Sequence, residues 1–250
     1  MSEWTETIPG KCSHGDRGNE GSTNFKKREK MKLSKYFLLT VIVITSLLVL
    51  FTHAQNTQQA SQEFNPKTVK IGDQVWMAEN LKVTHYRNGD PIPHVTSNSE
   101  WEDLSTGAYC AYDNDSSNAR IYGYLYNWYA VNDSRNIAPE GWHVPSDDEW
   151  QKLVNFLGGR EYAGAKLKSS YGWSNNGNGS NSSSFSALPG GFRSYRDGTF
   201  SFVRNNAYFW SATGYVTNYA WYWRLYYDIS EVSRLYHRKQ LGFSIRLVKD

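Results

Sequence analysis

The hydrophobic positions form three patterns along the chain, and the first is an unbroken apolar segment near the N-terminus. Residues 36–51 contain no charged side chain, and Lys32 and Lys35 precede them. A basic segment, an apolar segment and the small residue Ala54 together predict a secretory signal peptide over residues 31–54, cleaved after Ala54. The alternative is an uncleaved anchor that places residues 36–51 in the membrane, because this segment falls just short of the ~20 residues that span a bilayer.

Two polar segments flank the predicted signal peptide. Residues 1–30 form a polar N-terminal extension, and export signals rarely lie behind such a segment. Met31 followed by Lys32 is typical of a natural start, so a misassigned start is the second interpretation of this extension. Residues 55–68 are rich in Gln and Asn and predict a linker, which leaves residues 69–250 as one domain.

Short apolar or alternating runs bounded by turn residues form the second pattern, which is typical of β-strands. Val69–Ile71 and Val75–Met77 flank a Gly-Asp turn and predict a hairpin at the start of the domain. Asp197-Gly198 predicts the turn of another hairpin, between Phe192–Arg196 and Thr199–Val203. Further strands are expected at Tyr109–Tyr112, Tyr208–Ala212, Ala220–Tyr227, Val232–His237 and Leu241–Val248. Alternation in the last segment predicts a half-buried strand, whereas residues 121–130 fit a strand or a helix equally well.

Helical periodicity is the third pattern, and it is confined to one part of the domain. Ser146 and Glu149 have the spacing of a capping box, and Gly158-Gly159 ends the segment. The apolar residues recur at helical spacing between these signals, at Trp150, Leu153, Val154 and Leu157. A short second helix is expected at Ala163–Lys168, followed by a flexible surface loop at Ser174–Ser184. One or two helices among many short strands predict a single α+β domain.

Charge and composition exclude two classes of protein. The full chain has a net charge of +3, but residues 1–54 hold 8 of the 27 Lys and Arg and 5 of the 24 Asp and Glu. Residues 55–250 therefore carry 19 of each and have no net charge, which argues against a basic nucleic-acid footprint. The abundance of Trp, Tyr and Phe also argues against disorder. Cys110 is the single cysteine after residue 54, so no disulfide can form within the mature chain, and we expect a buried, inert thiol.

A polar insert at residues 113–118 is a candidate calcium site. Asp113 and Asp115 supply hard oxygen ligands at alternate positions, as calcium loops do. However, Asn118 stands where an EF-hand loop has its glycine, and Tyr124 stands where that loop has its bidentate glutamate. The other interpretation is an Asx-rich turn whose side chains bond their own backbone.

The aromatic residues suggest a binding surface on the strand at residues 220–227. Side chains alternate between the two faces of a strand, so Trp221, Trp223, Leu225 and Tyr227 are expected to share a buried face. The opposite face holds Tyr222, Arg224 and Tyr226. Together with Arg193 and Tyr195 of the preceding hairpin, these residues could form an exposed aromatic and basic surface, since Tyr and Arg are common contact residues. An ordinary solvated face of the sheet is the alternative. Trp173 is a further ligand-binding candidate, and a loop-anchoring role is its alternative.

Several motifs carry a resemblance to a known family. They are Gly123–Trp128, Pro139–Ser146 with Glu149-Trp150, Phe185–Arg193, Phe209–Ser211 and Gly242–Arg246. In this order they resemble the Fibrobacter succinogenes major paralogous domain, over about residues 69–250. The resemblance implies an exported bacterial surface or periplasmic domain. More distantly, the helix start and the closing Gly-Phe-x-x-Arg resemble the formylglycine-generating enzyme group, which implies a C-type-lectin-like fold with short irregular strands and few helices.

The distant resemblance raises an enzyme hypothesis that the residues do not favour. The oxidative relatives use a pair of cysteines, and family members often have a cysteine near Leu247, but Cys110 has no partner here. We therefore expect an exported, non-catalytic binding module, located in the periplasm, at the cell surface or outside the cell, without a cofactor unless calcium binds. Its expected ligand is a glycan or an envelope protein. A structural envelope component and a diverged enzyme are the two alternatives.

Overall fold

The computed structural model describes residues 29–30, 40–47 and 64–250. The chain divides into two compact units, Met1–Gln62 and Glu63–Asp250. The boundary between them falls inside the predicted linker, so the predicted domain corresponds to the second unit.

The described part of the first unit includes a helix over residues 40–47, within the predicted signal peptide. The hydroxyls of Thr45 and Ser46 donate hydrogen bonds to backbone carbonyls three and four residues earlier in this helix. Among the described ranges, no helix is long and apolar enough to cross a membrane. The predicted cleavage point after Ala54 and most of the predicted linker lie outside the described residues.

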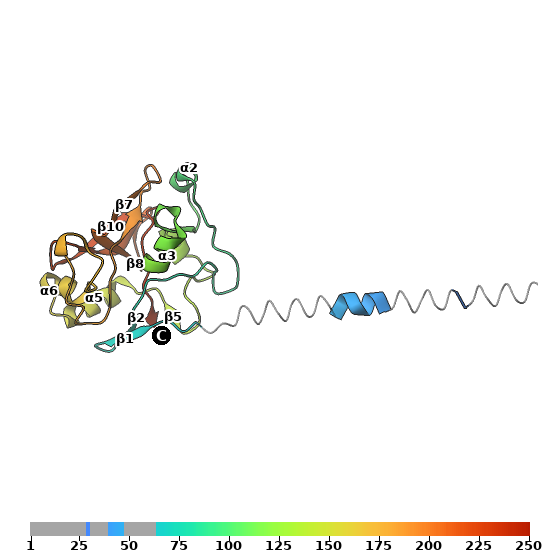
Figure 1. Ribbon diagram of the computed structural model, residues 1–250, viewed down its shortest axis with the longest axis horizontal. Helices are drawn as coiled ribbons and strands as arrows, with labels where there is room; N and C mark the ends of the chain where they lie inside the picture. Colours follow the sequence, from blue (N-terminus) through green and yellow to red (C-terminus); the bar gives the residue numbers. More distant parts are fainter. Residues whose placement is uncertain (1–28, 31–39, 48–63) are drawn as a thin grey trace, which may run out of the picture. The chain divides into compact units, whose positions relative to one another are not determined.

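The second unit is a mixed α+β domain that combines several small antiparallel sheets with a few short helices (Figure 1). In chain order its elements are β1 (Thr68–Ile71), β2 (Gln74–Met77), α2 (Asn98–Glu102), β3 (Tyr109–Cys110), η1 (Tyr112–Asn114), α3 (Ser116–Tyr122), β4 (Leu125–Tyr126), α4 (Trp128–Val131), β5 (Trp142–His143), α5 (Asp147–Phe156), α6 (Arg160–Leu167), η2 (Ser174–Asn176), β6 (Gly190–Arg193), β7 (Phe200–Val203), β8 (Asn206–Val216), β9 (Tyr219–Tyr226), β10 (Val232–Arg238) and β11 (Val248–Lys249). The structure therefore confirms the α+β class.

The first predicted hairpin is present and joins the two ends of the domain. Strands β1 and β2 pair around the Gly-Asp turn, with Ile71 opposite Gln74. Strand β11 adds to β2, since Val248 lies opposite Trp76, and the sheet has the order β1-β2-β11-β5. Figure 1 shows β1, β2 and β5 beside the C-terminus.

Helix α5 begins as its sequence predicts. The Ser146 side chain accepts a hydrogen bond from the Glu149 amide, and the Glu149 carboxylate accepts one from the Ser146 amide. This reciprocal capping box satisfies two amides that would otherwise lack helical partners. Trp150, Leu153 and Val154 are buried on one face of the helix. The second predicted helix is also present as α6, although it begins at Arg160, three residues earlier than expected.

The sheet with the longest strands has the order β10-β9-β8. Its two faces pack against different parts of the domain. Phe209 and Trp223 lie opposite each other on one face, where they join a core cluster with Trp150 of α5 and Leu167 of α6. The other face contributes Tyr222 to a second cluster. Both faces are therefore partly buried, which alternation within one strand cannot reveal.

The final segment differs from its predicted structure. Leu241–Val248 was expected to form a half-buried strand, but every residue of this segment is buried. Before β11 begins, isolated bridges join it to Tyr126, Arg193 and Phe209, which belong to three different sheets. Its carbonyls at Ile245 and Leu247 also accept hydrogen bonds from the amides of Leu81 and Met77. The segment therefore runs through the middle of the domain. Gly242 suits this position, because a Cβ atom there would lie 2.9 Å from the Trp101 side chain.

Two further segments differ from the expectations. Residues 121–130, which fitted a strand or a helix equally well, contribute to α3, β4 and α4. The Ser174–Ser184 segment was expected to be flexible, but its backbone is hydrogen-bonded to the rest of the domain. The amide of Gly179 donates to the Ser169 carbonyl, and the amide of Ser180 donates to the Ala165 carbonyl. These two backbone bonds attach the segment to the end of α6 and the residues that follow it.

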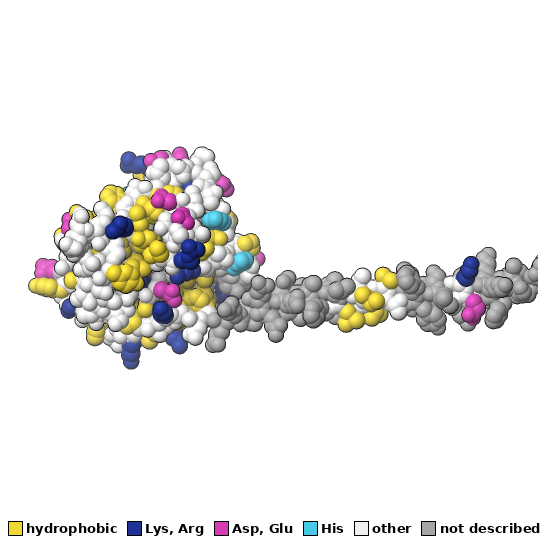
Figure 2. Space-filling model, viewed as in Figure 1, with side chains coloured by type: hydrophobic (Ala, Val, Ile, Leu, Met, Phe, Trp, Pro, Cys, Tyr) yellow, Lys and Arg dark blue, Asp and Glu magenta, His cyan; other side chains and the backbone are white. Residues whose placement is uncertain are grey.

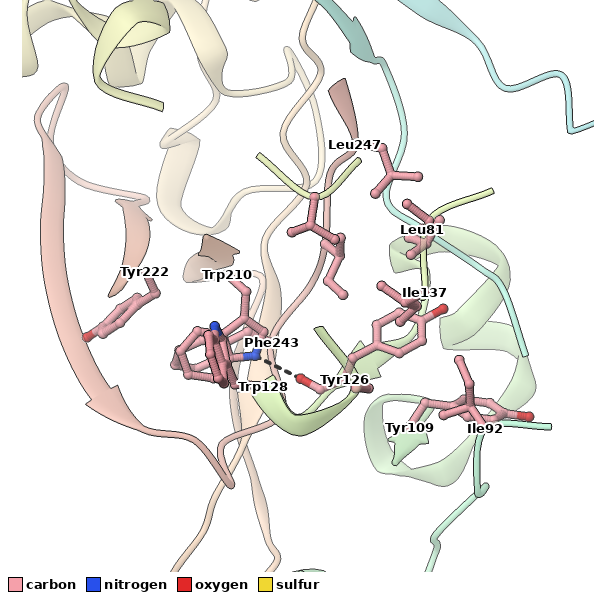
Figure 3. Close-up of a cluster of buried hydrophobic side chains, with 14 of the residues drawn as sticks. Leu81, Ile92, Tyr109, Tyr126, Trp128, Ile137, Trp210, Tyr222, Phe243 and Leu247 are labelled. Atoms are coloured by element: carbon pink, nitrogen blue, oxygen red, sulfur yellow. Dashed lines mark hydrogen bonds between the residues drawn. The ribbon is translucent and has the colours of Figure 1, made fainter. Parts of the chain in front are cut away.

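The largest core cluster combines aromatic rings from segments that lie far apart in the sequence (Figure 3). Tyr222, Trp210 and Phe243 come from β9, β8 and the final segment, and the Trp210 and Phe243 ring centroids are 4.4 Å apart. The Trp210 indole N–H donates a 2.9 Å hydrogen bond to the Tyr126 carbonyl, drawn as the dashed line in Figure 3. The buried Trp210 side chain therefore has a hydrogen-bond partner for its one polar atom.

Candidate functional site

A pocket of about 280 Å³ lies where the second hairpin (β6 and β7), the β10-β9-β8 sheet and the final segment meet. Its size is close to the lower end of the roughly 300–1,000 Å³ range of ligand pockets. Eleven residues line it: Phe192, Ser194, Tyr195, Arg196, Phe202, Tyr208, Tyr222, Arg224, His237, Leu241 and Phe243. We refer to this cavity as the aromatic pocket, because six of these residues are Phe or Tyr.

The floor of the aromatic pocket is made of packed rings from different strands. The rings of Tyr208 and Phe243 are stacked with centroids 5.0 Å apart, and Tyr222 lies 4.8 Å from Phe243. Phe192 meets Tyr208 edge-on at 5.3 Å. Because these rings also belong to, or pack against, the largest core cluster, they are fixed in position before any ligand arrives.

Arg224 places a positive charge beside this aromatic floor. Its guanidinium carbon lies 4.1 Å from the centre of the Tyr226 ring, a cation–π distance. Burial raises the pKa of both Tyr208 and Tyr222, and the charge of Arg224 acts in the opposite direction on each. The guanidinium thus favours ionisation of both phenols, while its buried Nε atom has no hydrogen-bond partner within residues 64–250 or the other described ranges.

Polar groups of the hairpin and of β10 line the rest of the pocket. The Arg196 side chain donates a 3.0 Å hydrogen bond to the Tyr195 hydroxyl, and the Tyr195 ring lies 5.4 Å from that of His237. The Arg238 amide donates to Nδ1 of His237, so the neutral ring carries its proton on Nε2. The pocket thus combines an apolar floor with several hydrogen-bond donors.

Of the predicted ligand-binding residues, the structure brings Tyr195, Tyr222 and Arg224 together in the aromatic pocket. Tyr222 differs from its expected exposed position, because only 4% of its surface is accessible and its ring is part of the core. Tyr226 is half-buried beneath Arg224 and does not line the pocket. The predicted surface is therefore a pocket rather than an open face of the sheet.

Arg193 does not lie on the exposed surface predicted for it, and Trp173 has the loop-anchoring position that was the alternative to its ligand-binding role. Arg193 is fully buried, and its guanidinium donates hydrogen bonds to oxygens of Val95, Ser97 and neighbouring residues. Trp173 is also buried, with its indole N–H shared between Ser169 and Ala187, so it anchors its loop. Neither residue remains a candidate for ligand binding, because the polar groups of both side chains form hydrogen bonds inside the domain.

A separate group of aromatic residues on the opposite face of the sheet was missed by the sequence analysis. Tyr215 and Tyr236 are exposed and stack with ring centroids 4.1 Å apart. Trp221 was expected in the core, but it is half-buried beside them, with the Arg234 guanidinium 3.6 Å from its ring centre. Alternation placed Trp221 on the correct face, but nothing local indicates that the core ends before this residue. We call Tyr215, Trp221 and Tyr236 the outer aromatic patch.

Of the two calcium candidates, Asp115 has a structural role. Asp115 precedes α3 and its carboxylate accepts a 2.8 Å hydrogen bond from the Ser117 amide, as a helix cap does. Asp113 adopts a positive φ of 53° within η1. Within the described ranges, no group of three or more His, Cys, Asp and Glu side chains is arranged to hold a metal ion. The geometry of this insert corresponds to the Asx-rich turn.

Cys110 lies inside the domain, as expected. Burial raises the pKa of its thiol to about 12, although the nearby charge of Arg193 opposes this shift. The thiol is therefore protonated at neutral pH, and a protonated, buried thiol is a poor nucleophile.

One histidine links two carboxylates at the other end of the domain. His143 lies 2.6 Å from Asp250 through Nδ1 and 2.8 Å from Glu149 through Nε2. Burial lowers the pKa of His143, but the two carboxylates outweigh this effect and raise it overall. Because Glu149 is also part of the capping box, the histidine fixes β5 and Asp250 to the start of α5.

The chain was compared with protein-family models, with curated proteins and with solved structures, and only a family model matches it. No curated protein and no solved structure matches it. The model of the Fibrobacter succinogenes major domain matches residues 69–249, which is almost the whole of the second unit. The motifs noted in the sequence fall within this range, and the chain belongs to the Fibrobacter succinogenes major domain family.

Proposed function

We propose that the domain is an exported, non-catalytic binding module whose aromatic pocket takes a sugar of a glycan. The observation that carries this proposal is the meeting of Tyr195, Tyr222 and Arg224, predicted as ligand contacts, in one pocket with further Phe and Tyr rings. Flat aromatic rings stack against the apolar face of a sugar, while the donors at the rim bind its hydroxyl groups. The pocket volume suits one sugar ring or the end of a chain.

The envelope location and the finer fold type belong to the same proposal. Export to the periplasm, the cell surface or the medium is supported by the sequence of residues 31–54. A C-type-lectin-like fold is supported by the short irregular strands and few helices of the domain. The diverged-enzyme alternative gains nothing from Cys110, which is buried and protonated.

A glycan array probed with the chain tests the proposal. We expect wild-type protein to bind a defined set of glycans, and Tyr195→Ala to lower this binding at least tenfold by removing a half-buried ring from the pocket. The matched control is Tyr236→Ala, which removes an exposed tyrosine of the outer aromatic patch. Loss of binding in the control variant with no change in Tyr195→Ala would show that the proposed site is wrong.

A further inference from the structure

The aromatic pocket carries positive charge that no acidic side chain of its lining balances. Arg196 and Arg224 line it, and none of the lining residues is Asp or Glu. Among the described residues, Arg196, Arg224 and the neighbouring Arg238 form no ion pair within 4.0 Å. The nearest acidic residue along the chain is Asp197, which is exposed and accepts hydrogen bonds from the amide and hydroxyl of Thr199.

Arg224 lines the pocket, and one of its donors is not used within the described part of the domain. Its buried Nε atom has no hydrogen-bond partner among the described residues, although the guanidinium packs against Tyr226. A buried N–H without an acceptor costs about 1–3 kcal/mol, so such groups are normally satisfied by protein, water or ligand. The fixed fork of a guanidinium binds two oxygens of a carboxylate at once.

His237 lines the same pocket and lies close to these arginines. Burial lowers its pKa, and the charges of Arg196 and Arg238 lower it further. The ring is therefore neutral at pH 7 and acts as a donor through Nε2, since Nδ1 already accepts the Arg238 amide. A ligand oxygen with negative charge would be attracted by both arginines and accept this hydrogen bond.

We infer that the ligand of the aromatic pocket is an acidic sugar, whose carboxylate binds Arg224 while its ring packs on the aromatic floor. This inference rests on the proposed function and specifies its ligand class. Its physical basis is the pairing of an apolar floor with an unopposed guanidinium inside one cavity of about 280 Å³. A neutral sugar would leave this charge without a counterion, and a simple inorganic anion would leave the aromatic floor uncovered.

The test is a microarray of uronic acid oligosaccharides and their carboxyl-reduced, neutral counterparts, probed with the full chain. We expect the acidic members to bind at least tenfold more strongly than their neutral counterparts, and this preference to shrink at high salt. Arg224→Gln should lower binding of the acidic members to the level of the neutral ones, while Arg224→Lys should retain part of the preference.

Two further variants keep the test sharp if a change at half-buried Arg224 prevents folding. Arg196→Gln removes the second guanidinium from an exposed position and should also reduce the preference, whereas Arg204→Gln, an exposed change outside the pocket lining, should not. Equal binding of acidic and neutral members would overturn the inference and leave the proposed function standing. Binding of no member by folded wild-type protein would contradict the proposed function itself.

Discussion

The guanidinium of Arg193 lies over the ring of Trp101, with its central carbon 4.5 Å from the ring centre. Five hydrogen bonds surround it, to the carbonyls of Gly198, Val95, Thr96 and Ser97 and to the side chain of Asn98. Among the residues that the structure describes, no carboxylate pairs with this buried charge, and it is surrounded by backbone oxygens and the Asn98 side chain instead. This arrangement holds the second hairpin against the segment that leads into α2.

Arg193→Lys should therefore destabilise the domain by about 3 kcal/mol or more. A lysine carries a similar charge but cannot reproduce the planar fork of donors, so several buried carbonyls would lose their partners. Urea unfolding followed by tryptophan fluorescence measures the change. Arg196→Lys, an exposed substitution in the same hairpin, is the control and should stay within about 0.5 kcal/mol. Equal effects of the two changes would contradict the role given to Arg193.

The start of α5 provides a second prediction. Ser146→Ala removes the acceptor of the capping box and should cost about 1 kcal/mol. Trp150→Ala empties a position that is 1% exposed and should cost about 3–5 kcal/mol. Lys152→Ala, on the exposed face of the helix, should change little. Denaturant melts of the three variants check this order, and similar losses for Trp150 and Lys152 would show that the buried face is misassigned.

The His143 contacts predict a pH dependence of stability. In the folded domain the pKa of His143 is raised above its ordinary 6.5, so the stabilisation is fully present below pH 6.5 and is lost as pH rises through the folded value. Burial raises the pKa of Glu149, but the hydrogen bonds from Ser146 and His143 outweigh it, so the pKa is lowered from 4.5. The contribution of Glu149 is therefore present above pH 4.5 and is lost as pH falls through its folded value.

Unfolding of wild type and His143→Gln at pH 6 and pH 9 measures this contribution. We expect the difference in unfolding free energy between the two proteins to be larger at pH 6, where the histidine is charged in the folded domain. An NMR titration of the His143 ring should also give a pKa above 6.5. A stability difference that is the same at both pH values would mean that the contacts to Asp250 and Glu149 contribute nothing through charge.

Export can be tested separately from binding. N-terminal sequencing of the protein from the periplasm or medium of a bacterial host should begin at or near Gln55, after cleavage behind Ala54. Recovery of the intact chain in the membrane fraction would instead support the uncleaved anchor.

Local signals of the sequence predicted the elements of the fold well, and long-range packing explains where they failed. The hairpin around Gly72 and the capping box of Ser146 depend on neighbouring residues alone, and both are present. In the same way, alternation correctly separated Tyr222 from Trp223 on the two faces of β9. It could not predict that Tyr222 is buried as well as Trp223, because the partners of Tyr222 come from β8 and the final segment.

The candidate site was predicted in part for the same reason. Tyr195 and Arg224 are remote in sequence, and the pairing of β6 with Gly242 and of β9 with β8 brings them to one pocket. Arg193, only two residues from Tyr195, has four of its five hydrogen-bond partners nearly 100 residues earlier in the chain, which no local pattern indicates. Residue type alone therefore identified contact-forming side chains without distinguishing those that bind within the domain from those that face a pocket.

The position of a bound saccharide tests the central claim most directly. Crystals of the protein soaked with the strongest-binding saccharide of the array should show a sugar ring in the aromatic pocket, beside Tyr195 and within hydrogen-bonding distance of Arg224. A sugar bound over Tyr215 and Tyr236 of the outer aromatic patch, with the pocket empty, would contradict the account.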